Sequence, residues 1–465
     1  MAISPLIGLL SSLFYFRLSN YKPNTMNRNA VLPIVKNDPK VVRGWVMYDW
    51  ANSVYQLTIA STIFPIYFNS VTHTNGSYTV SFFGYKIVNT VLYSWSIAFA
   101  YLFVAILSPL LSSFADYTGR RRAFMKTFTI IGSISCGALF FFNKDTIELG
   151  TIAFTLGTIG YGGSIVFYNS FLPVIASDDM QDRISARGYS LGYLGGVVLL
   201  LFNLFMIMQP GLFGIARGSA LPAQISFVTV FFWWLGFSQI TFDVLPKYTL
   251  RKRSRKERVL LNGYRELRQT FKKVIKSYRL TVFLIGFFFT MMGLLTTMFM
   301  AASYGEKELG VKEDVLIGTI LVIQLVGIAG AWSFARMSER FGNLRALLLS
   351  LVIWIAVCIY AFAIKGTGGF IVAAVVIGLV MGGTQSLARS TYSKMLPETT
   401  DHTSYFSYYD VLEKMATVLG TFMFGIIEAI TGSMRYSVLS ITIFFVLGLV
   451  SFLLLVAKVK PQRIG

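Results

Sequence analysis

The stretch SSFADYTGRRR, residues 112–122, is matched later in the chain by ARMSERFGNLR, residues 335–345. Asp116 and Gly119 of the first stretch correspond to Glu339 and Gly342 of the second, and the two pairs are separated by the same number of residues. In each copy an acid is followed three residues later by a glycine and then by basic residues. The first copy is the more complete, because Asn343 and Leu344 stand where further basic residues are expected.

Other landmarks keep nearly the same register. YNSFLP at residues 168–173 faces YSKMLP at residues 392–397, with a separation one residue larger, and Gly196 faces Gly420 at that larger separation. Repeated landmarks in one register indicate a chain built of two duplicated halves.

The composition places the chain in lipid. Of its 465 residues 55% are hydrophobic and 13% are charged, so a water-facing surface would be too apolar. A helix needs about 20 apolar residues to cross a bilayer. Segments of this kind predict an all-α membrane protein with twelve transmembrane helices, six in each half. They are residues 46–69, 88–114, 123–142, 149–173, 188–209, 223–245, 280–301, 315–335, 346–364, 369–393, 405–430 and 435–457.

Basic residues give the orientation. Lys and Arg are concentrated in the loops that lie on the same side of the membrane as the N-terminus. This bias predicts that both termini are cytoplasmic. The predicted organisation is a leader over 1–44, a first six-helix half over 45–245, a linker over 246–279, a second half over 280–457 and a tail over 458–465. Met26 opens a polar basic leader, so translation is expected to start there, with 1–25 an upstream extension. The alternative is that 1–25 form an amphipathic membrane anchor.

The linker carries its own pattern. Apolar residues at helical spacing alternate with basic ones and predict an amphipathic helix lying on the anionic inner leaflet. These apolar residues are Leu260, Tyr264, Leu267, Phe271, Val274 and Tyr278. A calmodulin-like or nucleic-acid partner is the alternative. The net charge of +20 is otherwise spread over short loops, with no basic domain for nucleic acid.

The repeated loop suits a conformational latch between helix ends. A carboxylate can pair with a guanidinium or with a neighbouring helix terminus, and such contacts can break when one half rocks against the other. The alternative is a basic cluster that only sets topology. The predicted latch residues are Asp116, Gly119, Arg120, Arg121, Glu339 and Gly342.

Several longer motifs carry a family resemblance. YDWANSVYQLTIASTIFPIYF, NSFLPVIA, RGYSLGYLGG, YGEKELGV and GGTQSLARSTYSKMLPE together resemble the vacuolar-effluxer-like branch of the major facilitator superfamily, over residues 36–458. The branch includes fungal amino-acid exporters and bacterial relatives, and the leader looks like that of the bacterial members. The resemblance implies transport by alternating access. The chain departs from the branch at TMMGLLTT, where Met291 and Met292 replace an Asn-Asp pair, and at Ser407.

Polar residues inside the spans predict the substrate pathway, because they are costly in lipid. Asp49, Asn52, Tyr55 and Gln56 follow one another at spacings of three, three and one, and they are expected to share one helix face. For Asp49 a helix-capping role is the alternative, and Arg389 can pair with a substrate carboxylate, with lipid phosphate or with Glu339. The predicted pathway residues are Asp49, Asn52, Tyr55, Gln56, Asn169, Gln324, Gln385 and Arg389.

The eleventh segment is the most ionic. Asp410 and Lys414 stand four residues apart, which favours an intrahelical pair. This pairing leaves Glu413 as the candidate for proton coupling.

These patterns predict a secondary transporter in the inner membrane that exports or exchanges a small polar metabolite, such as an amino acid. A sugar or lysolipid carrier and a non-transporting receptor are the alternatives. No phosphate-binding loop, nucleophile–base set or metal-ligand cluster is evident, so neither an enzyme, a cofactor nor a metal site is predicted. Membrane lipids, the substrate and protons are the expected partners of a monomer.

Overall fold

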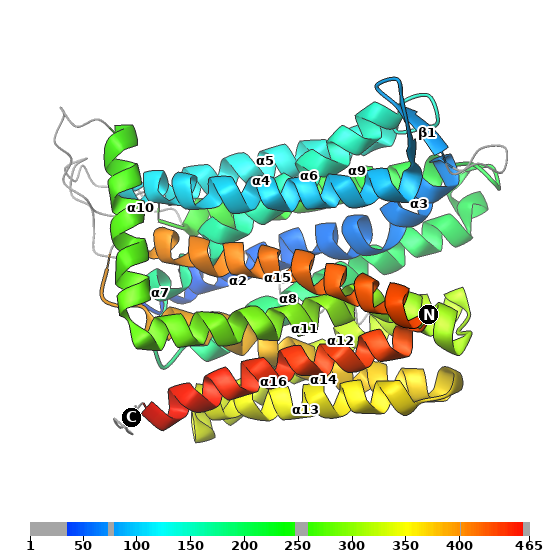
Figure 1. Cartoon of the computed structure of the whole chain (residues 1–465). Helices are drawn as coiled ribbons and strands as arrows, with labels where there is room; N and C mark the ends of the chain where they lie inside the picture. The colour runs from blue at the N-terminus through cyan, green and yellow to red at the C-terminus, as the bar shows by residue number, and fades with distance from the viewer. Residues whose placement is uncertain (1–34, 73–78, 247–258, 400, 459–465) are drawn as a thin grey trace, which may run out of the picture. The chain divides into compact units, whose positions relative to one another are not determined.

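The computed structural model describes residues 35–72, 79–246, 259–399 and 401–458, and these described residues belong to one compact unit. Most of the predicted leader, the start of the linker and nearly all of the tail lie outside these ranges. The described part is almost entirely helical, with helices packed side by side (Figure 1). Eleven of its helices are long and apolar enough to cross a membrane by length and composition.

The first predicted span lies in an interrupted helix. α2 (Pro39–Val54) continues into the π-helical turns of η1 (Tyr55–Ile63) and then into α3 (Phe64–Thr72). The start is well defined, because Pro39 occupies the first turn and the Asp38 side chain accepts a hydrogen bond from the Lys40 N–H at 2.8 Å. A two-stranded antiparallel hairpin, β1 (Thr79–Phe82) and β2 (Tyr85–Val88), follows it and was not predicted.

The remaining helices of the first part are α4 (Asn89–Thr118), α5 (Arg121–Ala138), α6 (Ile147–Asn169), α7 (Leu172–Ile175), α8 (Gln181–Met208) and α9 (Leu221–Val244). Short 3-10 turns lie at η2 (Leu139–Phe141) and η3 (Pro210–Phe213). We call residues 39–244 the N-terminal half.

The linker contributes α10 (Val259–Lys276). The C-terminal half, residues 278–458, contains α11 (Tyr278–Leu309), α12 (Glu313–Phe341), α13 (Asn343–Ala363), α14 (Gly366–Met395), α15 (His402–Thr431) and α16 (Met434–Lys458). The predicted amphipathic helix therefore exists, but it ends before Tyr278, which begins α11 instead. Ser277 separates the two helices, and its side chain accepts from the Leu280 N–H at the start of α11.

Each half has its own apolar core. The buried members of the largest cluster run from Val274 to Leu455, whereas those of the next two clusters come from residues 42–245. Between the halves, α8 packs against α12 and α14, and α4 packs against α15. The halves are thus two bodies with separate cores that meet along a few helices.

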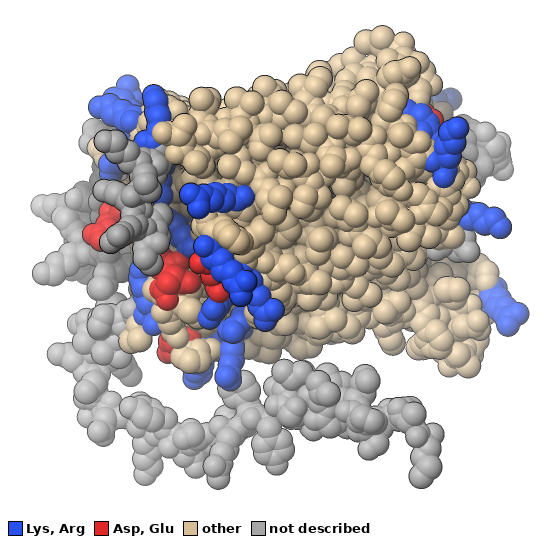
Figure 2. All heavy atoms as spheres, turned by 90° about the horizontal axis from the view of Figure 1, so that it is seen from below, with Lys and Arg blue, Asp and Glu red and all other residues tan. Residues whose placement is uncertain are grey.

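The bundle has two distinguishable ends. α10 runs across one of them, at the left of Figure 1, where α16 also ends, and the β1–β2 hairpin lies at the other. We call these the α10 end and the hairpin end. On the face seen in Figure 2, the charged side chains gather toward the two ends and leave a broad uncharged belt between them. This distribution is the one expected of helices that cross a membrane.

Candidate functional site

An ion pair between the halves lies inside the bundle. Asp49 on α2 and Arg389 on α14 are 340 residues apart in sequence, yet Arg389 Nη1 and Nη2 each donate to Asp49 Oδ2 at 3.3 Å. Both side chains are buried, with 8% and 2% of their surface exposed. The structure therefore joins two of the predicted pathway residues. Asp49 does not cap its helix, since Asp38 does so.

Other acceptors from the N-terminal half complete the surroundings of Arg389. Its Nε donates to Ser185 Oγ at 2.9 Å, its Nη2 to the Ser185 carbonyl at 2.9 Å and its Nη1 to Asn169 Oδ1 at 3.4 Å. A guanidinium has five N–H donors in a fixed plane, so this arrangement holds it in one orientation. The predicted alternative of an Arg389–Glu339 pair is wrong, because Glu339 pairs with another arginine.

Three aromatic rings also enclose the guanidinium. Its central carbon lies 4.9 Å from the ring centre of Trp45, 5.6 Å from that of Tyr168 and 4.2 Å from that of Tyr189. The Tyr168 hydroxyl donates to Asp49 Oδ2 at 2.7 Å. Cation–π attraction at such distances adds to the ion pair when the site is dry.

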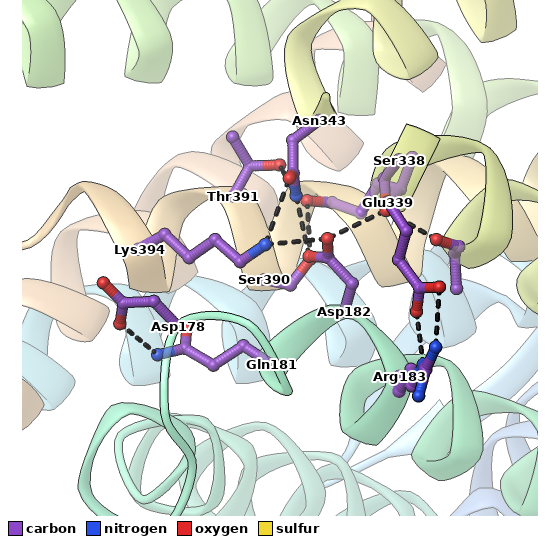
Figure 3. A network of polar contacts seen from close by, with 12 residues as sticks. Asp178, Gln181, Asp182, Arg183, Ser338, Glu339, Asn343, Ser390, Thr391 and Lys394 are labelled. Carbon is purple, nitrogen blue, oxygen red and sulfur yellow. Dashed lines mark hydrogen bonds and ion pairs between the residues drawn. The ribbon is translucent and has the colours of Figure 1, made fainter. Parts of the chain in front are cut away.

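A second polar network joins the halves nearer the α10 end (Figure 3). Asp182, in the first turn of α8, accepts from Ser338 Oγ at 2.8 Å, from Asn343 Nδ2 at 2.7 Å and from Lys394 Nζ at 2.7 Å. Asn343 also donates to Thr391 Oγ1 at 3.1 Å. One carboxylate of the N-terminal half thus binds side chains on three helices of the C-terminal half, namely α12, α13 and α14.

Asp116 lies between its own loop and the other half. It accepts from Arg121 Nε at 2.7 Å, and its oxygens also accept from the backbone N–H groups of Thr403 and Ser404 at 3.3 and 2.7 Å. Thr403 and Ser404 belong to the first turn of α15, where N–H groups lack partners within the helix. A carboxylate at this position also faces the positive end of the helix dipole.

The second copy of the repeated loop makes a different contact. Glu339 binds the guanidinium of Arg183, in the first turn of α8, through two hydrogen bonds, of which that from Nη2 is 2.8 Å long. The glycines close the turns that place both acids, because Gly119 ends α4 with φ 68° and Gly342 ends α12 with φ 86°. Arg120, by contrast, is exposed next to Gly119.

The ionic segment of α15 lies deeper in the bundle. Lys414 Nζ donates to Asp410 Oδ1 at 2.7 Å, so the predicted intrahelical pair is confirmed. Both residues are buried, and the other oxygen, Asp410 Oδ2, has no hydrogen-bond partner among the described residues. Glu413 is half-buried beside them.

The remaining predicted pathway residues do not converge on this site. Gln385 accepts a hydrogen bond from the Tyr193 hydroxyl across the halves at 2.6 Å, and Gln324 is half-buried on α12. Asn52 is buried, and its Nδ2 has no hydrogen-bond partner among the described residues. Gln56 is half-buried in η1.

Tyr55 was expected on the same face as Asp49, and this expectation is wrong. Its hydroxyl bonds to Thr158 Oγ1 at 2.7 Å, and its ring packs on Tyr161 and Trp234 within the N-terminal half. Six residues advance an α-helix by about one and two-thirds turns, so Tyr55 points roughly 120° away from Asp49. Spacings of three and three therefore do not keep a single face.

Sequence reasoning missed Trp45, Tyr168, Ser185, Tyr189 and Asp182. One signal was available for part of this set. Gly188, Gly192 and Gly196 recur every four residues on α8. Gly188 lies against Asp49 and Arg389, and an added Cβ would meet both, with Arg389 Nη2 at 2.9 Å. A glycine at this point lets α2 and α14 approach α8 closely, so its neighbours in sequence were candidates for the site.

Comparison with known proteins shows which family the chain belongs to. Residues 37–463 match the family model described as vacuole effluxer Atg22 like. The chain belongs to this family. It is 28% identical over 424 residues to the uncharacterized MFS-type transporter YxiO of Bacillus subtilis, covering 90% of this chain and 95% of that protein. It is 23% identical over 489 residues to autophagy-related protein 22 of Vanderwaltozyma polyspora, covering 91% and 92%.

Solved structures of similar shape include transporters of the major facilitator superfamily. FucP in the outward conformation superposes with a TM-score of 0.67 at 13% identity, over 90% of this chain and 99% of that one. A bacterial homologue of ferroportin in the outward-facing state gives 0.62 at 11% identity, over 91% and 100%. At such identities the likeness shows the fold. Family and fold together make this chain a multi-pass membrane transporter of the major facilitator type.

Proposed function

We propose that this chain is a secondary transporter that moves a small polar metabolite, such as an amino acid, by alternating access between its two halves. Twelve spans are proposed, with the continuous run α2–η1–α3 as the first. Its three parts have 16, 9 and 9 residues, which together are longer than the roughly 20 residues that a helix needs to cross a bilayer. The α10 end is proposed to face the cytoplasm of a bacterial inner membrane, with the amphipathic α10 on the lipid surface.

The observation that carries the proposal is the buried Asp49–Arg389 pair. A buried ion pair is weak evidence for stability, since burying its charges costs about as much as their attraction returns. A pair that joins two bodies with separate cores is more useful as a switch, which forms when the halves close and breaks when they part. In this proposal the described conformation is closed at the cytoplasmic end.

The contacts nearer the surface are the proposed latch. Asp116 at α15, Glu339 at Arg183 and Asp182 at Lys394 each cross from one half to the other at the α10 end. Opening this end requires all three to separate. Gly119 and Gly342 fix the turns, while Arg121 holds the Asp116 carboxylate. Glu413, beside the buried Asp410–Lys414 pair, is the proposed proton-coupling residue.

Cross-linking tests the switch. Arg183 and Glu339 lie on opposite halves and are partly exposed, so cysteines at both positions can be joined by a short bifunctional maleimide. The native Cys136 and Cys358 are buried and give little background. The joined protein is expected to lose uptake into proteoliposomes, whereas each single-cysteine variant treated alike keeps it. Full uptake by the joined protein would contradict alternating access at this end.

A ligand screen tests the substrate class. A ligand that binds the folded protein raises its melting temperature, so the purified protein is heated with amino acids, sugars, nucleosides and lysolipids in turn. An amino-acid hit that is lost in Gln385→Ala supports the proposal. Stabilisation by sugars or lysolipids alone would favour the corresponding carrier. Folded protein that none of the screened compounds stabilises would favour the receptor.

A further inference from the structure

The site that encloses Arg389 belongs entirely to the other half. Trp45 lies on α2, Tyr168 and Asn169 on α6, and Ser185 and Tyr189 on α8, together with Asp49 on α2. We call these six residues the cation seat. From the C-terminal half, the Arg389 side chain occupies the seat, and the Ser386 carbonyl accepts a hydrogen bond from Ser185 at its edge.

The cation seat is held together by contacts within its own half. The Trp45 and Tyr168 rings are stacked with centres 4.4 Å apart, and Trp45 Nε1 donates to the Tyr168 carbonyl at 3.0 Å. Tyr48 packs against Tyr168 from the side, with ring centres 5.0 Å apart, and the Tyr168 hydroxyl fixes Asp49. The seat therefore keeps its shape when Arg389 leaves.

An empty cation seat would be unstable without water or a substitute cation. Asp49 would keep one hydrogen bond, from Tyr168, and would lose its only described charge partner. A buried carboxylate without a counter-charge is costly. The electron-rich ring faces favour a positive group in the same place.

We infer that the cation seat binds a small organic cation with a guanidinium group when the halves part, and that Arg389 competes with this cation for the seat. The inference rests on the proposed function, because Arg389 can leave only if the halves separate. Binding and closure then exclude each other, so the cation holds the cytoplasmic end open and its departure lets Arg389 return.

The chemistry of the seat selects the ligand class. Metal ions such as Ca²⁺ require six or more oxygen ligands, whereas three sides of this seat are aromatic. A guanidinium can stack on rings and donate in its plane to several acceptors at once, here Asp49, Asn169 and the Ser185 carbonyl. A primary ammonium would satisfy fewer of them, so it should bind more weakly.

Chemical rescue tests the seat directly. The full chain with Arg389→Ala is purified in detergent and heated with millimolar propylguanidinium, propylammonium or the neutral propylurea. Propylguanidinium is expected to raise the melting temperature saturably, by about 2 °C or more, with a smaller rise for propylammonium and none for propylurea. The same rescue should disappear in the double variant Arg389→Ala/Asp49→Asn.

Arg183→Ala is the matched control, because it removes an exposed guanidinium that also pairs with an acid across the halves. A rise of the same size in this control, or with propylurea, would overturn the inference. So would the absence of any propylguanidinium effect on well-folded Arg389→Ala.

A second measurement keeps Arg389 in place and separates the two hypotheses. Ser386 is buried on α14 where its carbonyl accepts from Ser185 Oγ at 2.8 Å, so Ser386→Cys reports parting of the halves by maleimide labelling. Propylguanidinium is expected to accelerate labelling several-fold. Labelling that occurs but does not respond to it overturns the cation seat. No labelling under any condition contradicts the proposed function itself.

Discussion

Asp49→Asn removes the charge that faces Arg389 while keeping nearly the same volume. Removing one partner of a buried ion pair costs about 3–5 kcal/mol. The lower figure applies here, because Arg389 keeps its two 2.9 Å hydrogen bonds to Ser185 and its ring contacts. Since the pair joins the halves, we expect the closed state to lose about 3 kcal/mol relative to the state open at the α10 end, a shift of roughly 100-fold.

The assay is the rate of maleimide labelling of Ser386→Cys in membranes, measured with and without Asp49→Asn. When the closed state dominates, the labelling rate is proportional to the small fraction of open protein. The labelling rate should therefore rise about 10- to 100-fold. Asp145→Asn removes an exposed acid near the hairpin end and serves as the control. Equal rates in Asp49→Asn and Asp145→Asn would refute the view that this pair holds the halves together.

Three further substitutions test other parts of the site. Asp116→Asn should slow transport at least tenfold without loss of expression, because the α15 terminus and Arg121 lose their shared anion; an unchanged uptake rate would remove the latch. Glu413→Gln should abolish the pH dependence of uptake while Glu428→Gln keeps it, and a preserved pH dependence would end the proton hypothesis. Gly188→Ala should destabilise the protein by about 1–3 kcal/mol in chemical denaturation, because its Cβ meets Asp49 first and then Arg389. Gly236→Ala, with open space around it, should be neutral or stabilising, and equal effects would contradict the close packing.

The fold was largely predictable because a transmembrane helix is specified locally, by about 20 apolar residues in a row. The β1–β2 hairpin was not, since its strands are four residues long and lie between two apolar segments. The end of the amphipathic helix was also misplaced, because Tyr278 fits its apolar spacing equally well. Ser277, which caps the next helix, is the residue that decides the boundary.

The site was predictable only in part. Asp49, Asn169 and Arg389 could be chosen one by one, since polar residues in a span are costly. Their pairing could not, because the partners are 340 residues apart in Asp49–Arg389 and 156 in Arg183–Glu339. Trp45, Tyr168 and Tyr189 were missed for another reason. Aromatic residues are common in membrane helices, and only the arrangement around a guanidinium distinguishes these three.

The two latch acids differ in the kind of donor that they meet, and this difference affects how each contact can evolve. Besides the Arg121 side chain and the Ser404 hydroxyl, Asp116 binds backbone N–H groups at the start of α15, which every residue except proline provides. Glu339 binds the side chain of Arg183, which a single codon change can remove. Among relatives, substitutions at the start of α15 that keep a backbone N–H can therefore retain part of the contact with an acid at position 116. Positions 183 and 339 should instead change together, and a charge reversal at one should be inherited with a reversal at the other.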